Sequence, residues 1–104
     1  MIARLWRGVV RSKDKDSYYD YLQETGLKEY GAAPGNRGVW VFRRVQAETV
    51  EFTLISLWDS YDAIRAFAGD DFDKAVYYPE DRKFLLEMSP KVEHYEVLGG
   101  QALT

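Results

Sequence analysis

Apolar and polar positions along the first third of the chain change from strand-like to helix-like spacing. Ile2–Arg11 is rich in β-forming residues and ends at the polar run Ser12-Lys13-Asp14, which predicts a first strand. Ser12 is expected to cap a helix, in which apolar and aromatic residues recur three or four positions apart, at Tyr18, Tyr21, Leu22 and Thr25. Gly26 is expected to weaken or end this helix, before a further turn over residues 27–30.

The remaining segments are expected in a regular order. A Gly-rich stretch over residues 31–38 predicts a loop. Strands are expected at 39–45 and 50–58, helices at 61–68 (capped by Asp59-Ser60) and 71–77, a further turn at 82–88, and a last strand at 92–98. This order is the split βαβ pattern. The sequence therefore predicts one α+β domain over residues 1–98, ferredoxin-like (βαββαβ) with an antiparallel four-stranded sheet, and a loose C-terminal tail over 99–104.

The two central strands are apolar on both faces. A sheet with one wet face alternates apolar and polar residues, but Val39-Trp40-Val41-Phe42 and the run from Phe52 to Trp58 do not alternate in this way. The helices of one subunit cover only one face. We therefore expect the second face to pack against the same sheet of another copy, in a homodimer that forms an α/β barrel.

The charge and composition of the chain limit the classes of partner that it is expected to bind. The 104 residues include 14 basic and 17 acidic side chains, interspersed along the chain, with a net charge of −3. This balance argues against a nucleic-acid partner. Arg4 and Arg7 interrupt the apolar N-terminus, and no run is long enough to span a bilayer, so we expect no membrane partner and a cytoplasmic location.

Metal chemistry has few possible ligands in this sequence. Cysteine is absent, which excludes thiolate nucleophiles, iron–sulfur clusters and cysteine zinc sites. His94 is the only histidine, so one subunit cannot build a multi-histidine site. We expect no metal.

A family resemblance rests on the corner after the third strand. Leu57-Trp58-Asp59-Ser60 is followed by an amphipathic helix with Phe67, then by Asp71-Phe72 and, later, by His94-Tyr95-Glu96-Val97. This arrangement resembles the antibiotic biosynthesis monooxygenase superfamily over Ile2 to Leu98. The resemblance implies a dimeric α/β barrel with a pocket between helices and sheet in each subunit. Members oxidise polycyclic phenols without a cofactor, degrade haem, isomerise lactones or have no known activity.

The haem-degrading branch of this family does not match at its functional positions. Its members use an asparagine in the first strand, a tryptophan in the second helix and a haem-ligating histidine beyond it. The corresponding positions here are Trp6, Phe67 and Tyr77. Tyrosine in place of the histidine would change the iron chemistry, so the resemblance argues against haem degradation.

The phenol-oxidising branch needs a dry pocket, a proton acceptor and a group that stabilises an anion. His94 titrates nearest neutrality and is the candidate base. Arg4 or Arg65 is the candidate for holding negative charge. The candidates for binding a flat ring are aromatic, namely Trp6, Trp40, Phe67, Tyr77 and Tyr78.

Structural roles compete with each of these assignments. His94 also suits a hydrogen-bonded structural histidine or a residue at the dimer contact, and Arg4 a buried pair with Glu96 on the last strand. Arg65 also suits an exposed position, and Trp6 and Trp40 suit either role. Tyr77-Tyr78 suits a pocket lid and a dimer-contact arm equally.

The functional hypothesis is a cofactor-independent monooxygenase acting on a small aromatic or polycyclic substrate, with no bound cofactor. The alternative is a non-catalytic protein of the same fold that binds a small ligand or a partner. A related isomerase, which would need a proton shuttle but no oxygen, is the third reading.

Overall fold

The apolar stretches of the sequence form three long antiparallel strands in the computed structural model, which describes residues 1–101. They are β1 (Ile2–Arg11), β2 (Asn36–Gln46) and β3 (Thr49–Trp58). β3 lies between β1 and β2 and pairs with both along its whole length. Even-numbered positions of β3 are buried and odd-numbered ones are partly exposed. Strand parity therefore sends one set of side chains toward the helices and the other toward the opposite face.

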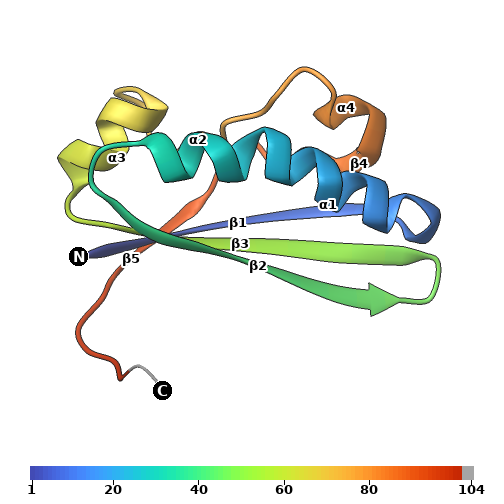
Figure 1. Ribbon diagram of the computed structural model, residues 1–104, viewed down its shortest axis with the longest axis horizontal. Helices are drawn as coiled ribbons and strands as arrows, with labels where there is room; N and C mark the ends of the chain where they lie inside the picture. Colours follow the sequence, from blue (N-terminus) through green and yellow to red (C-terminus); the bar gives the residue numbers. More distant parts are fainter. Residues whose placement is uncertain (102–104) are drawn as a thin grey trace.

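All the long helices lie on one face of this sheet (Figure 1). They are α1 (Lys15–Glu24), α2 (Gly26–Ala32) and α3 (Tyr61–Ala68). The predicted helix over 61–68 is confirmed, with the Ser60 hydroxyl accepting a hydrogen bond from the Ala63 N–H and Gly69 ending it at a φ of 94°. A positive φ is available to glycine without steric cost, so Gly69 is a suitable stop.

Two predictions for the first helical region are wrong. Ser12 does not cap α1; its hydroxyl and amide donate to the carbonyls of Ala47 and Glu48, and a 3-10 turn precedes the helix. The loop expected over residues 31–38 is much shorter, because α2 continues to Ala32 and β2 begins at Asn36. Gly35, at a φ of 85°, turns the chain between them, and its carbonyl accepts the Asp59 N–H.

The fourth position of the sheet holds two short strands in place of the single predicted one. β4 (Leu85–Glu87) pairs with Val9 and Val10, and β5 (Glu93–Glu96) pairs with residues 2–5, all antiparallel. The ferredoxin-like order is kept, with β2, β3 and β1 followed by this divided edge. The expected strand over 92–98 is therefore shorter at both ends.

The segment between α3 and α4 (Asp81–Phe84) explains why the edge strand is divided into β4 and β5. Residues 69–80, termed the strap, have no helix, so the helix expected over 71–77 is wrong. Its backbone pairs instead with the segment that separates β4 from β5: the Ala75 N–H donates to the Pro90 carbonyl and the Val92 N–H to the Asp73 carbonyl. Residues 90–92 thus bond to the strap and not to β1. The turn expected over 82–88 is half right, because α4 gives way to β4 at Leu85.

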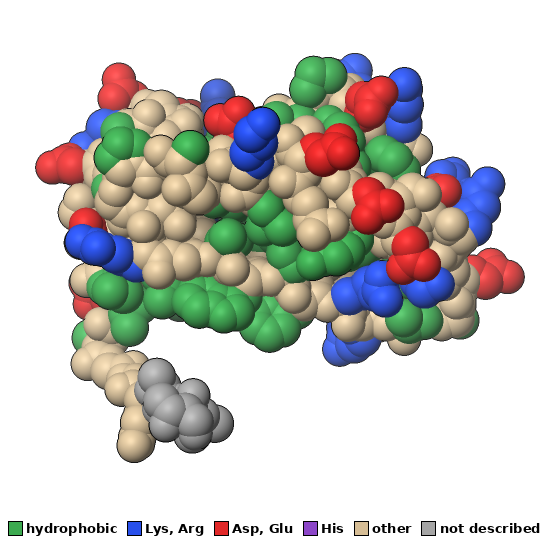
Figure 2. Space-filling view, viewed as in Figure 1, with side chains coloured by type: hydrophobic (Ala, Val, Ile, Leu, Met, Phe, Trp, Pro, Cys, Tyr) green, Lys and Arg blue, Asp and Glu red, His purple; other side chains and the backbone are tan. Residues whose placement is uncertain are grey.

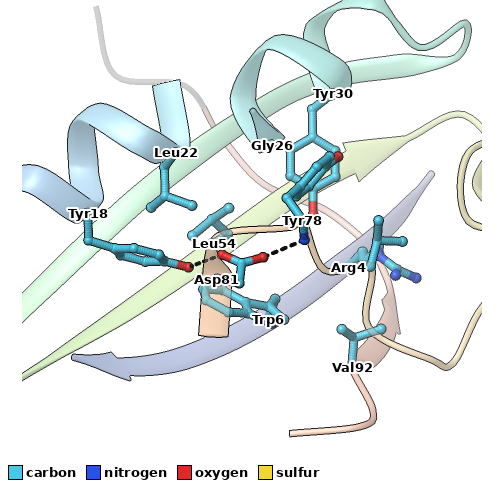
Figure 3. A pocket seen from close by; sticks show the side chains of 11 residues that line it. Arg4, Trp6, Tyr18, Leu22, Gly26, Tyr30, Leu54, Tyr78, Asp81 and Val92 are labelled. Carbon is cyan, nitrogen blue, oxygen red and sulfur yellow. Dashed lines mark hydrogen bonds between the residues drawn. The ribbon is translucent and has the colours of Figure 1, made fainter. Parts of the chain in front are cut away.

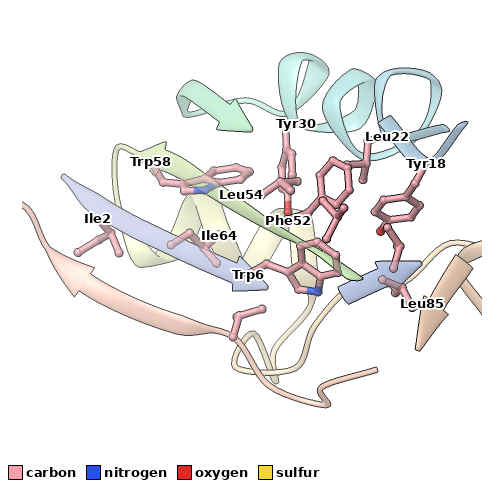
Figure 4. Close-up of a cluster of buried hydrophobic side chains, with 13 residues drawn as sticks. Ile2, Trp6, Tyr18, Leu22, Tyr30, Phe52, Leu54, Trp58, Ile64 and Leu85 are labelled. Atoms are coloured by element: carbon pink, nitrogen blue, oxygen red, sulfur yellow. The ribbon is translucent and has the colours of Figure 1, made fainter. Parts of the chain in front are cut away.

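The core fills the space between the sheet and the helices (Figure 4). Large side chains meet there from both layers, among them Trp58 and Phe52 from β3, Tyr18 from α1, Tyr30 from α2 and Ile64 from α3. Trp58 is fully buried between Tyr30 and Phe67, with ring centroids 6.1 and 5.2 Å away.

The opposite face of the sheet carries apolar side chains without a helix over them. Trp40, Phe42 and Tyr95 are 48, 52 and 50% exposed. Their strand partners are Ile55, Thr53 and Ala3, so the exposed rings share a face with the odd-numbered positions of β1 and β3. Figure 2 shows apolar side chains along the lower side of the molecule, where the sheet lies. The predicted apolar surplus of the hairpin is thus present on this uncovered sheet face.

The last described residues of the chain follow β5. Residues 99–101 form neither helix nor strand, and the rest of the predicted tail, 102–104, lies outside the described residues, so the loose tail stays a prediction. Within residues 1–101, no helix has the length and apolar character that crossing a membrane requires.

Candidate functional site

A small cavity lies between the sheet, α1, α2 and the strap (Figure 3). It measures about 20 Å³, taken as the space open to the centre of a water molecule. That is room for about one water. Its walls are mostly aromatic and aliphatic, with two ionisable side chains of opposite charge, and are formed by Arg4, Trp6, Tyr18, Leu22, Gly26, Tyr30, Leu54, Val76, Tyr78, Asp81 and Val92.

Asp81, at the start of α4, is the buried acid of this cavity. One carboxylate oxygen accepts the Tyr18 hydroxyl at 3.2 Å and the other accepts the Tyr78 backbone N–H at 2.6 Å. Burial raises the pKa of Asp81, against the opposing effect of these two hydrogen bonds. A raised pKa makes a carboxylate a stronger proton acceptor than a solvated carboxylate, and such shifts are common at functional sites.

Sequence reasoning missed Asp81. The residue follows Glu80 in a polar run after Tyr77-Tyr78-Pro79, and it has the appearance of a solvated helix start. Only the path of the strap turns its side chain under Tyr78 and against Tyr18. The unusual Tyr-Tyr-Pro run was the one available signal.

Arg4 forms the basic side of the cavity and is only 2% exposed. Its Nη2 donates to the Lys74 carbonyl at 3.1 Å, and its Nη1 donates to the Phe72 carbonyl and lies 3.0 Å from His94 Nε2. The expected pair with Glu96 is wrong: Glu96 lies opposite Ile2 in the strand register, whereas His94 lies opposite Arg4. Arg4 thus fastens the strap to β1.

His94 lies beside Arg4 and does not line the cavity. Arg4 can only donate, so His94 Nε2 accepts, and the proton resides on Nδ1, 3.3 Å from an Asp73 oxygen. Burial and the neighbouring guanidinium lower the pKa of His94, and Asp73 opposes them. The role of His94 as a base remains a prediction; its contacts make it a neutral acceptor that orients Arg4.

Tyr30 reaches from α2 toward Arg4 and closes the cavity between them (Figure 3). Burial raises the pKa of Tyr30, and the nearby guanidinium acts in the opposite direction. The phenol therefore stays protonated at neutral pH, and its hydroxyl is able to donate a hydrogen bond.

Of the other predicted site residues, the structure brings Trp6 and Tyr78 to the cavity together with Arg4. Tyr77 packs edge-on against Trp6, with ring centroids 6.3 Å apart, and its hydroxyl donates to the Ser89 carbonyl. In this arrangement Tyr78 lines the cavity and Tyr77 packs against Trp6, while the choice between a pocket lid and a dimer-contact arm stays a prediction.

Three predicted residues lie elsewhere. Phe67 packs in the core on Trp58 and Tyr30. Arg65 is exposed on α3, bonded to Asp62 at 2.6 Å and placed over the Phe72 ring. Trp40 lies on the uncovered sheet face.

Comparison with known proteins finds the fold in solved structures. No family model and no curated protein sequence matches the chain. A protein of unknown function from Nitrosomonas europaea, NE2512, is 14% identical, with a TM-score of 0.66 over 99% of this chain and 94% of that one. The haem degrader MhuD from Mycobacterium tuberculosis, solved with two haems in its active site, is 16% identical, with a TM-score of 0.66 over 98% of this chain and 100% of that one.

A third solved structure, Rv0793 from Mycobacterium tuberculosis, is 17% identical, with a TM-score of 0.64 over 97% of this chain and 98% of that one. These likenesses confirm the predicted ferredoxin-like α+β fold. At such identities they leave the activity to be argued from the site.

Proposed function

We propose that this protein is a member of the antibiotic biosynthesis monooxygenase superfamily that oxidises a small aromatic or polycyclic molecule with dioxygen, without a cofactor. The observation that carries the proposal is Asp81, a buried carboxylate that faces an aromatic cavity with Arg4 among its walls. This chemistry needs a proton acceptor, an anion-stabilising group and a dry site. Asp81, Arg4 with Tyr30, and the aromatic walls supply them.

For an anthrone-type substrate, the proposed reaction passes through a peroxide and releases one water. Asp81 takes a proton from the ring methylene, and the resulting anion, held at Arg4, adds dioxygen to form a peroxide. Asp81 returns its proton to the terminal peroxide oxygen. Loss of water then leaves a carbonyl where the methylene stood, so one oxygen atom stays in the product and one leaves as water.

Substrate entry requires the strap to move. The cavity holds about one water, whereas an aromatic substrate needs several times that space. Val76 and Tyr78 of the strap form one wall. Two hydrogen bonds from Arg4 and two backbone bonds to residues 90–92 hold the strap, and the Tyr78 N–H bonds to Asp81. We assign the strap the role of a lid whose opening breaks some of these bonds.

The expected result of the central experiment is oxygen uptake. Purified protein is mixed with a panel of anthrones, naphthols and quinols, and an oxygen electrode and absorbance spectra record the reaction. We expect uptake above the rate of autoxidation, at one O2 per carbonyl formed for the anthrones. Heat-unfolded protein is the control, and no uptake across the panel would count against the proposal.

A second candidate is a non-catalytic ligand-binding protein, because the mostly aromatic and aliphatic walls of the cavity suit binding without any reaction. Saturable quenching of tryptophan fluorescence by the same panel, without oxygen uptake, would select it. A spectral change that persists without oxygen would instead select an isomerase.

We also propose that two copies pair through the uncovered sheet face. Trp40, Ile55 and Leu5 form one row across three strands, because Ile55 is the register partner of both of the others. Covering such rows against a second sheet removes apolar area from water at about 25 cal/mol per Å². A twofold axis lets the same surface serve on both copies.

The proposed dimer is tested by a charge at its centre. Ile55→Asp is expected to change the molar mass in solution from that of two chains to that of one, because each copy would bury an unpaired carboxylate. Light scattering after size exclusion measures this change. Tyr19→Asp, on the exposed side of α1, is the matched control and should leave the dimer intact; a wild-type monomer would contradict the proposal.

A further inference from the structure

Arg4 is a buried cation without a carboxylate bonded to it. Its contacts among residues 1–101 are two backbone carbonyls and one neutral imidazole. The nearest acid of this network, Asp73, bonds to the far nitrogen of His94 and is largely exposed. A buried charge is costly unless it is paired. Burial lowers the pKa of Arg4, which reflects the same cost.

One donor of the guanidinium has no partner. Within the described chain, Arg4 Nε is buried and makes no well-aligned hydrogen bond, while both terminal nitrogens are engaged by the strap and His94. The Tyr30 hydroxyl lies close enough to the guanidinium to oppose the lowering of the Arg4 pKa by burial. Arg4 and Tyr30 both line the cavity, and Tyr30 extends from α2 toward Arg4 (Figure 3). An unsatisfied buried donor is rare and requires an explanation. Here the guanidinium with its free N–H and the Tyr30 phenol both line a cavity with room for about one water.

We infer that the cavity binds the ionised oxygen of an aromatic acid or acidic phenol, with Arg4 Nε and the Tyr30 hydroxyl as its hydrogen-bond donors. The inference rests on the proposed function only in placing an aromatic ligand in this cavity. Charge-assisted bonds to an oxyanion are stronger than bonds to a neutral oxygen. The site therefore selects anionic over neutral ligands of the same shape.

The other ionisable groups around Arg4 are consistent with this selection. His94 is uncharged and accepts from Arg4, so it adds no second cation. Asp81 shares the cavity, and two negative charges in one small space disfavour each other. Binding of an anion is therefore coupled to protonation of Asp81, and affinity rises as the pH falls toward the pKa of Asp81 in the complex.

The test compares 2-naphthoate with 2-naphthamide, which share shape and differ in charge. Titration calorimetry is expected to show the acid binding at least about tenfold more tightly. Arg4→Gln should abolish this ratio, whereas Arg37→Gln, an exposed arginine paired with Asp59, should keep it. Equal affinities, preference for the amide, or no binding of either compound would overturn the inference.

Two further variants keep the test informative if Arg4→Gln fails to fold. Tyr30→Phe should lower the acid-to-amide ratio several-fold, and Asp81→Asn should tighten acid binding at neutral pH and remove its pH dependence. An unchanged ratio in both variants would overturn the inference. Acid preference without oxygen uptake would refute the proposed oxygenase alone, and oxygen uptake from a neutral anthrone without acid preference would refute the anion site alone.

Discussion

Replacing Asp81 by asparagine is expected to lower substrate-dependent oxygen uptake by about 10²- to 10⁴-fold, the usual contribution of a positioned proton acceptor. The asparagine keeps both contacts. Its carbonyl accepts the Tyr78 N–H, and its amide donates to the Tyr18 hydroxyl, which can reverse its role. The loss of rate is therefore separable from loss of structure. Initial rates at saturating substrate, with the circular dichroism spectrum as a check of folding, measure it.

The matched control is Asp20→Asn, which removes an exposed carboxylate from α1 and should leave the rate unchanged. A rate for Asp81→Asn within about twofold of wild type would exclude Asp81 as the base. His94→Gln would then become the variant to examine, because His94 is the base expected from the sequence.

The pH dependence of stability gives the Asp81 variant a second readout. Burial raises the pKa of Asp81 in the folded protein, so the protonated form favours folding. Its contribution is complete below the ordinary carboxyl pKa and is lost as the pH rises through the raised value. The free energy of unfolding of Asp81→Asn, relative to that of wild type, should therefore increase as the pH rises above about 4, the ordinary carboxyl pKa. Urea denaturation at several pH values measures the difference.

Replacing Trp58 by alanine is expected to cost about 3–5 kcal/mol of unfolding free energy, the usual cost of emptying a large aromatic site. Trp58 is fully buried between Tyr30 and Phe67. Its indole N–H also donates to the Ser56 hydroxyl at 2.9 Å, and that partner would lose its bond. Because small domains are stable by only about 5–15 kcal/mol, this variant should lose a large part of the free energy of unfolding.

Urea denaturation followed by circular dichroism tests the Trp58 variant. Tyr19→Ala, which removes a ring that is 39% exposed on α1, is the control and should change stability by less than about 1 kcal/mol. Equal losses in the two variants would mean that the packing at Trp58 does not dominate the core.

Local signals predicted the long elements of the fold. Continuous β-forming runs predicted β1, β2 and β3, and the Ser60 cap with Gly69 predicted both ends of α3. Strand parity also placed Arg4 and Trp6 on one face of β1, where both line the cavity. These features depend on residues close in sequence, whose spacing the chain displays directly.

The strap and the divided edge strand depended on contacts between distant segments. Residues 71–77 have a helical pattern, yet backbone bonds between residues 73–75 and residues 90–92 hold them extended. No local signal reports that pairing. It removes residues 90–92 from β1 and produces two short strands where one was expected.

The chemistry of the candidate site also depends on contacts between segments that are distant in sequence. The sequence by itself determined which groups are available: one histidine, no cysteine, and an arginine and a tryptophan on the buried side of the first strand. Only the tertiary structure decided their partners, because the register of β5 puts His94 in place of Glu96 beside Arg4, and the strap brings Asp81 under Tyr18. Composition and spacing select the side chains, but burial and pairing across the fold select which of them remain charged, and those depend on residues 60 to 90 positions apart.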